Sequence, residues 1–224
     1  FDLGKRFLEL LNQFDLGDFR LFEDVPDAPK YDIAVIEGTA INEEQFDRLK
    51  KIRTKSKFVI AIGACACLGG VQELKNYQDK NQTIKYVYPI IKGIDNPDIH
   101  PIHDIIKVDL ELQGCPINKE EFYKAIASLL AGRKPETPQR PVCYECQLKE
   151  NECLLQKGQP CIGPISLGGC GAPCPSAGFI CDGCRGPLEE INLANMKKAL
   201  KDKGKPQEIE AVLERFGKRN EIQN

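Results

Sequence analysis

The chain has 224 residues and a formal net charge of −2, and its 31 basic residues are interleaved with 33 acidic ones. It lacks the massed positive charge that nucleic-acid binding requires, so we expect no nucleic-acid partner. No apolar run approaches the roughly 20 residues that cross a bilayer, so we expect no membrane span either. The eleven cysteines show no disulfide pattern, which indicates a reducing compartment such as the cytoplasm.

The first predicted element is an amphipathic helix at the start of the chain. Its apolar residues recur at helical spacing, at Phe7, Leu8, Leu11 and Phe14. The chain opens at Phe1, without a methionine and almost inside this pattern. We therefore expect a preceding segment, and any targeting signal would lie in it.

Short β-rich runs then alternate with helical stretches as far as Gly132. The predicted strands cover residues 19–22, 32–36, 57–62, 84–91 and 105–112. This alternation predicts an α/β domain with a mainly parallel, flavodoxin-like sheet. The run at 57–62 is apolar throughout, as expected for a strand that is buried on both faces.

Two helices of this domain carry recognisable start signals. Asn42 with Gln45 and Asn118 with Glu121 match the capping-box pattern ahead of apolar residues at helical spacing. The second helix should end at Gly132. It is expected to bury Phe122, Ile126, Leu129 and Leu130.

Two cysteines follow strands of the predicted sheet. Cys65 comes after the strand at 57–62 and Cys115 after the strand at 105–112, each among glycines. Because reactive groups of open α/β sheets gather beyond the carboxyl ends of the strands, both are candidate ligands of a metal cluster, although small buried thiols remain an alternative. Cys67 is expected to be a spare thiol, since residues two apart in a turn seldom point at one metal centre.

The strongest signal is a group of eight further cysteines set among glycines and prolines. They form two sets of four, Cys143, Cys146, Cys153, Cys161 and then Cys170, Cys174, Cys181, Cys184. Eight thiolates are the number that two four-iron clusters need. Glycine and proline favour the sharp turns of such cages, so regular helices and strands are not expected here.

Other uses of these eight cysteines remain open. A disulfide framework is typical of small secreted domains, which does not fit the α/β domain that precedes it. Structural zinc also uses Cys-x2-Cys pairs, but normally pairs two of them across a spacer, and here one pair lies at each end. A third four-iron cluster at Cys65 and Cys115 would need two more thiolates, which a Cys-x2-Cys pair before Phe1 would supply.

Several motifs occur in an order that resembles a known family. The chain is similar to the small, electron-transferring subunit of cytosolic [NiFe] hydrogenases, especially the delta subunit of the sulfhydrogenase type. The likeness extends from about residue 32 to residue 186. The motifs are Ile36-Glu37-Gly38, Gly63-Ala64-Cys65-Ala66, Gly69-Gly70-Val71, Gly114-Cys115-Pro116, Pro141-Val142-Cys143-Tyr144-Glu145-Cys146, Cys161-Ile162-Gly163-Pro164 and Cys181-Asp182-Gly183-Cys184-Arg185-Gly186.

This resemblance implies a flavodoxin-like domain at 1–133, an iron–sulfur domain at 134–190 and a helical tail at 191–224. It implies three [4Fe-4S] clusters and no catalytic nickel site in this chain. The implied partners are a large subunit that carries the NiFe centre and a further subunit with flavin and NAD(P) or with iron–sulfur clusters. The implied ligands are Cys65 and Cys115 for the proximal cluster, Cys170, Cys174, Cys181 and Cys184 for the medial cluster, and Cys143, Cys146, Cys153 and Cys161 for the distal cluster.

Two positions depart from the better-known periplasmic members of this family. Cys143 stands where those proteins have a histidine, and Cys174 adds a fourth thiolate to the medial set. Both changes favour the cytosolic branch, and the extra negative charge at Cys143 should lower the distal potential. An enzyme linked to coenzyme F420 or to heterodisulfide reductase is the alternative within the family, and an iron–sulfur or zinc interaction module is the alternative outside it.

The remaining candidates favour structural roles. His100 and His103 lie in a proline-rich segment with no cysteine or acidic pair to complete a metal site, which predicts a loop. No glycine-rich nucleotide motif is present, so we expect no NAD(P) or ATP site. Glu37 is expected to hydrogen-bond structurally at a strand end, with a proton relay as the alternative. A final helix should pack against its own chain through Ile209, Val212, Leu213 and Phe216, and a docking face for another subunit is the alternative.

Overall fold

The core of the molecule is a parallel sheet of three strands. The computed structural model describes residues 4–18, 28–90, 92–94, 97–201, 203 and 206–216, without the side chains of residues 80, 81, 206 and 209. Within this part of the chain the strand order is β1-β2-β3, and both neighbouring pairs are parallel. The strands are β1 (Tyr31–Glu37), β2 (Ser56–Ile62) and β3 (Leu110–Leu112). The predicted α/β class is therefore confirmed, while the strand expected at 19–22 lies outside the described residues.

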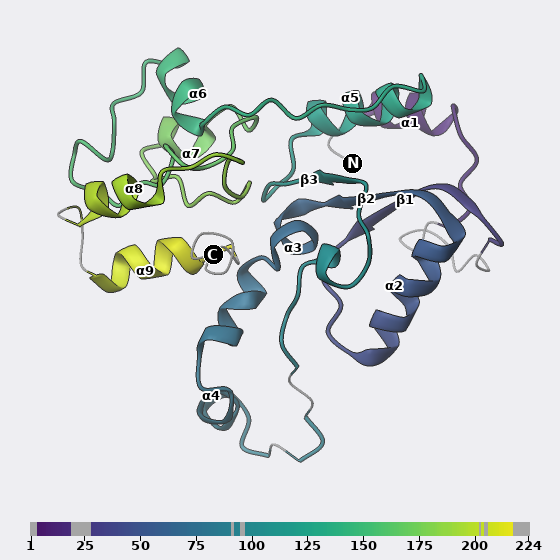
Figure 1. Ribbon diagram of the computed structural model, residues 1–224, viewed down its shortest axis with the longest axis horizontal. Coiled ribbons are helices and arrows are strands. Elements are labelled where there is room, and N and C mark those ends of the chain that lie inside the picture. Colours follow the sequence, from purple (N-terminus) through teal and green to yellow (C-terminus); the bar gives the residue numbers. More distant parts are fainter. Residues whose placement is uncertain are drawn as a thin grey trace.

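The central strand β2 is buried on both faces, as its apolar run predicts. Val59 and Ala61 pack in one core cluster with helices α2 (Glu43–Lys55) and α3 (Gly63–Leu68). Ile60, which points to the opposite face, packs in a second cluster. Figure 1 shows these layers, with α1 and α5 along one side of the sheet and α2 on the other.

The second cluster is formed with helices α1 (Lys5–Leu11) and α5 (Lys119–Leu130). Leu10 of α1 and Ile126 of α5 are buried in this cluster, with 2% and 5% of their surface exposed. Leu8, in contrast, is 61% exposed, so only part of the predicted apolar face of α1 is buried.

Both predicted helix starts are confirmed. The Asn42 side chain accepts a hydrogen bond from the Gln45 backbone at 2.9 Å, and the Gln45 side chain accepts one from Ile41 N at 2.7 Å. Asn118 Oδ1 accepts from Glu120 N and Glu121 N at 2.9 and 3.3 Å. These bonds satisfy amide groups that have no partner within the helices themselves.

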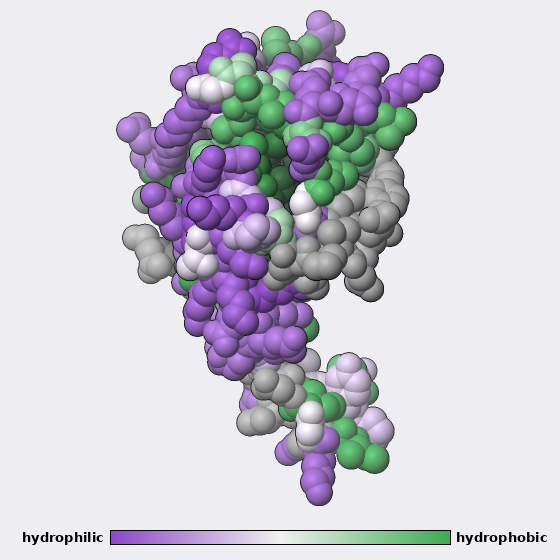
Figure 2. All heavy atoms as spheres, turned by 90° about the vertical axis from the view of Figure 1, so that its right-hand side faces the viewer, coloured by the Kyte–Doolittle hydropathy of each residue, from purple (hydrophilic) through white to green (hydrophobic). Residues whose placement is uncertain are grey.

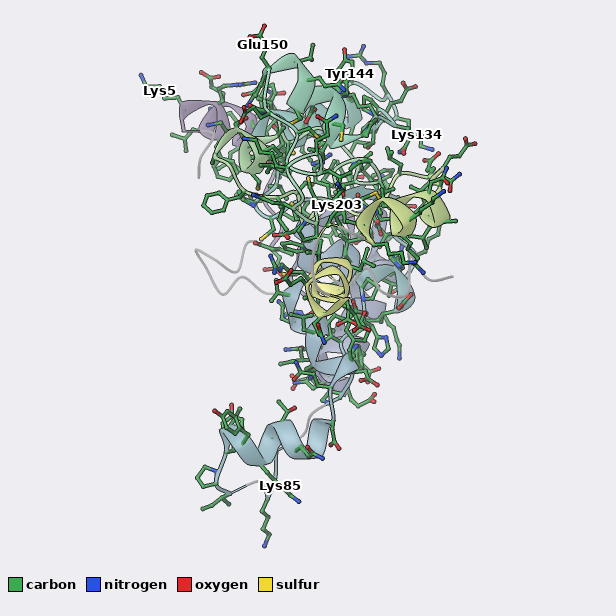
Figure 3. All side chains as sticks on the ribbon, turned by 90° about the vertical axis from the view of Figure 1, so that its left-hand side faces the viewer. Lys5, Lys85, Lys134, Tyr144, Glu150 and Lys203 are labelled. Carbon is green, nitrogen blue, oxygen red and sulfur yellow. The ribbon has the colours of Figure 1, made fainter. Side chains whose placement is uncertain are left out.

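The strand predicted at 84–91 was wrong, because this segment begins as helix α4 (Lys80–Val87). Asp79 Oδ1 accepts a hydrogen bond from Gln82 N at 3.1 Å, which is a helix start that the β-rich composition concealed. The helix projects from the body, and Lys85 marks its position in Figure 3, opposite the end that carries Tyr144 and Glu150. Tyr86 is 93% exposed on this projection.

The strand predicted at 105–112 is shorter than expected. Only Leu110–Leu112 pairs with β2, and the chain before it forms a 3-10 turn, η2 (Ile102–Asp104). Asp109 explains where pairing begins, because its backbone N–H donates to Val59 O at 2.9 Å and its carboxylate accepts from Val59 N at 2.8 Å. A second 3-10 segment, η1 (Val71–Tyr77), follows α3.

The prediction that α5 buries Leu130 was also wrong, since Leu130 is 40% exposed. It lies at the rim of a wide apolar hollow whose walls include Ile33, Phe58 and Leu129. The apolar side chains exposed near the top of Figure 2 belong to this side of the molecule. The helix does end as expected, because Gly132 follows with a positive φ of 68°.

The cysteine-rich part contains short helices that its glycines and prolines did not predict. They are α6 (Val142–Leu148) and α7 (Pro173–Ser176), joined by irregular chain. The tail adds α8 (Leu193–Leu200) and α9 (Pro206–Glu214). Val212 and Leu213 of α9 pack with α8 and with the cysteine-rich segment, which confirms that this helix packs on its own chain.

The core clusters separate the molecule into two parts that match its sequence halves. One pair of clusters surrounds the sheet, and the other pair lies among residues 142–213. Phe216 packs against the sheet-side cluster, so the end of the tail contacts the first part. The division into 1–133, 134–190 and 191–224 stays a prediction.

Candidate functional site

Four cysteines of the first set line one hollow in the cysteine-rich part. Its walls include Cys143, Cys146, Cys153 and Cys161, and its volume is about 30 Å³. Helix α6 places Cys143 and Cys146 three residues apart, which brings them to one face of the helix. The remaining wall is mostly apolar, with Val142, Leu154, Leu155, Gly163, Pro164 and Pro175.

The thiols of this hollow are difficult to ionise without a cation. Burial raises the pKa of Cys143 to about 11, and the nearby thiolates of Cys161, Cys146 and Cys153 act in the same direction. Burial also raises the pKa of Cys161, although backbone N–H groups of Cys181 and Gly163 oppose that rise. Four thiolates crowded into an apolar hollow need a positively charged centre among them, so the donor set fits an iron–sulfur cluster.

Gly163 closes the hollow because it has no side chain. A Cβ at this position would lie 3.3 Å from Cys143 Sγ and 3.7 Å from Cys161 Sγ. The backbone can therefore approach both sulfurs closely, which a larger residue would prevent.

The second set gathers beside the first. Burial raises the pKa of Cys170 and of Cys174, and the Cys184 thiolate adds to both effects. Cys174 lies in α7, and Cys181 is 8% exposed in the same core cluster as Cys161. Three of the four residues predicted to bind the medial cluster thus interact electrostatically, since Cys184 acts on both Cys170 and Cys174. The fourth, Cys181, packs in the same core cluster as Cys161 of the first set.

Cys65 and Cys115 meet at the carboxyl edge of the sheet, as the strand pattern predicts. Cys65 lies in α3, directly after β2, and Cys115 follows β3. Ala64 N donates to Gly114 O at 2.9 Å and so joins the two loops. Burial raises the pKa of the Cys115 thiol, and the neighbouring thiolates of Cys184 and Cys65 raise it further.

Cys65 has a specific polar neighbour. Gln72 Nε2 lies 3.2 Å from Cys65 Sγ, within reach of a hydrogen bond to sulfur. Gly70 permits this arrangement, because a Cβ there would lie 2.9 Å from the sulfur and its backbone has a positive φ of 70°. The described residues at this edge include two cysteines, half the number of thiolates that a four-iron cluster takes.

The three groups of cysteines follow one another through the molecule. Arg185, directly after Cys184, donates to Gln113 O, two residues before Cys115, at 2.6 Å, and Cys181 N donates to Cys161 Sγ at 3.3 Å. Cys161 in turn shares the hollow with Cys143. The three predicted ligand sets are therefore adjacent in space, in the order sheet edge, second set, first set.

Cys67, His100 and His103, which we do not expect to be ligands, have partners within the fold. Cys67 is fully buried and donates to Ala61 O at 3.4 Å. His103 Nδ1 lies 2.7 Å from Glu111 Oε1, and His100 is 3.7 Å from Asp104. Among the described residues, no three cysteine, histidine or acidic side chains converge closely enough to hold a single metal ion.

Sequence reasoning missed two buried charged residues at the site. Glu145 lies between two cysteines of α6, and its carboxylate accepts from Gly169 N and Gly171 N at 2.7 and 2.8 Å. Arg185 follows Cys184 and is 2% exposed. The only available signal was their position beside cysteines, because spacing rules do not show whether a charged side chain is buried.

No helix in the described part of the chain is both long and apolar enough to cross a bilayer.

The profile of the family described as NADH ubiquinone oxidoreductase, 20 Kd subunit, matches residues 2–129. A subunit delta of sulfhydrogenase 2 from Pyrococcus furiosus is 35% identical over 221 residues, which cover 96% of this chain and 91% of that protein.

Two further relatives agree. A vhu subunit of the F420-non-reducing hydrogenase from Methanococcus voltae is 34% identical, covering 96% of this chain and 88% of its own length. A crystal structure of an NAD+-reducing [NiFe]-hydrogenase in the H2-reduced state matches with a TM-score of 0.54 and 30% identity, over 61% of this chain and 84% of that one. The chain therefore belongs to the family of the 20 Kd subunit of NADH ubiquinone oxidoreductase and, within it, to the small subunits of [NiFe] hydrogenases.

Proposed function

We propose that this chain is the electron-relay subunit of a cytoplasmic [NiFe] hydrogenase. In this proposal three [4Fe-4S] clusters conduct electrons between the NiFe site of a large subunit and an acceptor subunit. The observation that carries it is the succession of three groups of cysteines, which begins at the sheet edge and ends in the hollow lined by Cys143, Cys146, Cys153 and Cys161.

Each ligand set has a stated place in the relay. Cys65 and Cys115 would bind the proximal cluster together with two thiolates from outside this chain's described residues. Cys170, Cys174, Cys181 and Cys184 would bind the medial cluster, and the set in the hollow would bind the distal one. Bound clusters supply one-electron carriers, while the protein supplies geometry, burial and hydrogen bonds to sulfur.

Zinc is the competing use of these cysteines. A tetrahedral zinc ion draws its ligands to a single point, whereas a four-iron cluster spreads them around a larger core. A relative from Archaeoglobus profundus that is named as an iron-sulfur subunit of an F420-non-reducing hydrogenase supports the cluster. The family membership supports it as well, because hydrogenase subunits act in electron transfer.

The acceptor subunit is proposed to carry flavin and NAD(P), or further iron–sulfur clusters. The solved NAD+-reducing hydrogenase supports the first choice. The relatives named as F420-non-reducing hydrogenases support an acceptor other than F420. An enzyme linked to heterodisulfide reductase stays the second candidate.

Iron and acid-labile sulfide analysis of the anaerobically purified full-length protein tests the proposal. We expect about twelve irons per chain, since each of three clusters holds four. Stoichiometric zinc without visible absorption would contradict it. The subunits that co-purify at equal amounts test the partners, and a nickel-containing large subunit is the expected result.

A further inference from the structure

Arg185 joins the sheet-bearing part of the molecule to the cysteine-rich part. Its Nη1 and Nη2 donate to Glu121 Oε2 and Oε1 at 2.7 and 2.8 Å. Nη1 also donates to Gln113 O at 2.6 Å, and Nε donates to Gly168 O at 2.8 Å. One planar, permanently charged guanidinium therefore fixes three separate segments at once.

The segments of Gln113, Gly168 and Arg185 each carry a predicted cluster ligand. Gln113 precedes Cys115 by two residues, and Gly168 precedes Cys170 by two. Arg185 directly follows Cys184. The side chain thus connects a sulfur predicted to bind the proximal cluster with two sulfurs predicted to bind the medial one.

The surrounding backbone is shaped around the guanidinium. A Cβ on Gly169 would lie 2.7 Å from Arg185 Nη2, and Gly169 has a positive φ of 113°. Asn118 Nδ2 donates to Gly169 O at 2.6 Å, which adds a second tie between the two parts. The segment that carries Cys170 is therefore held by Asn118 from the sheet-bearing part and by Arg185 from the cysteine-rich part.

The charges of this ion pair are buried unequally. The Arg185 side chain is 2% exposed, whereas that of Glu121 is 22% exposed. Solvent screens the carboxylate more than the guanidinium, so the pair presents a net positive field to the nearby sulfurs. At Cys170 this field is opposed by the buried Glu145 carboxylate, whose Oε2 lies 3.9 Å from Cys170 Sγ.

We infer that Arg185 is a positioning residue for electron transfer between the Cys115 site and the site at Cys170 and Cys184. It fixes the separation of the two sites, and its charge favours the reduced state of the clusters beside it. In the step concerned, one electron leaves the proximal cluster, which is oxidised, and reduces the medial cluster, without any bond being formed or broken. The inference rests on the proposed function.

The test uses the full-length protein purified with its accompanying subunits and follows each cluster signal by electron paramagnetic resonance during a redox titration. Arg185→Met should lower the midpoint potential of the proximal and medial signals, because it removes a buried positive charge. Glu121→Gln should raise it, because it removes the opposing negative charge. A purely structural loosening would not shift the two variants in opposite directions.

Arg185→Lys separates charge from geometry. It keeps the charge but loses the planar fork, so the potentials should stay closer to the wild-type values while freeze-quench experiments show slower arrival of the electron at the medial cluster. Arg215→Met is the matched control. Arg215 contacts Asp182, which lies between Cys181 and Cys184, at 2.8 Å. Because the Arg215 side chain is 44% exposed, its removal should shift the potentials less than Arg185→Met does.

The inference is overturned if Arg185→Met and Glu121→Gln shift the potentials in the same direction, or by no more than Arg215→Met. If Arg185→Met fails to retain iron, Glu121→Gln alone carries the test of charge: it should raise the potentials, and by more than Arg215→Met shifts them. A wild-type protein without iron–sulfur signals would overturn the proposed function together with the inference. A wild-type protein with three clusters and unresponsive variants would overturn the inference alone.

Discussion

The backbone N–H of Cys181 donates a hydrogen bond to Cys161 Sγ at 3.3 Å. The two residues belong to different predicted ligand sets, and both are 8% exposed in one core cluster. The second set therefore supplies an amide donor to a sulfur of the first. Such a bond stabilises negative charge on the ligand and couples the structure of one site to the properties of the other.

Replacing Cys161 should therefore disturb two sites. Cys161→Ala is expected to reduce the iron content and also to alter the paramagnetic signal of the cluster at Cys170, Cys174, Cys181 and Cys184. Cys153→Ala is the control, since Cys153 lines the same hollow but is exposed, and it should affect only its own cluster. Identical spectra for the two variants would contradict the coupling.

Filling the space at Gly163 should weaken cluster binding. A methyl group at 3.3 Å from Cys143 Sγ would force the sulfur or the backbone to move. Gly163→Ala is expected to cost about 1–3 kcal/mol, as overpacking usually does, and to lower iron occupancy. Ala177→Ser adds one heavy atom at an exposed position and should leave the iron content unchanged. Equal iron in both variants would show that the hollow tolerates the extra atom.

Truncating Leu200 should destabilise the cysteine-rich part, although this residue belongs to none of the proposed ligand sets. Leu200 is fully buried and packs in the cluster that joins α8 and α9 to Ile162 and Ile165. Leu200→Ala is expected to cost about 2–5 kcal/mol in unfolding free energy. Leu148→Ala, at a position that is 69% exposed, should change it by less than about 0.5 kcal/mol. Urea unfolding, monitored through the loss of cluster absorption, compares the two variants.

Asp109 should make the stability of the sheet depend on pH. Burial opposes ionisation, but the hydrogen bonds from Arg53 and from Val59 N outweigh it and lower the pKa of Asp109 below its ordinary value of 3.8. The ionised group therefore contributes stability that is fully present above pH 3.8 and is lost as the pH falls through the lowered pKa. Asp109→Asn should cost about 1–3 kcal/mol at pH 7.

The urea midpoints of wild type and Asp109→Asn should approach each other as the pH falls below 3.8 and through the lowered pKa of Asp109. Asp32→Asn is the control, because Asp32 pairs with Lys57 at 2.6 Å but its side chain is 83% exposed. That variant should follow the wild-type curve at every pH. A constant difference between wild type and Asp109→Asn from about pH 7 to about pH 2.5 would contradict this account.

Local patterns predicted much of the fold. Alternation of apolar runs and capped helices located β1, β2, α2 and α5, because backbone pairing and helix capping depend on residues close in sequence. The same local reasoning was wrong for 84–91, where one Asp79 cap directs a β-rich run into a helix. It also assigned too long a strand at 105–112, because the start of pairing depends on Asp109 meeting Val59 from the neighbouring strand.

By itself, the sequence determined how many thiols the protein offers and which two lie at the sheet edge, since these follow from residue identity and from the strand pattern. Tertiary structure decided which sets adjoin, and which charges are buried between them. Arg185 and Glu121 are 64 residues apart, and no local rule predicts that they meet. Burial of a charge depends on all the chain that surrounds it, so only the folded molecule shows where a charge is shielded from solvent and acts on its neighbours.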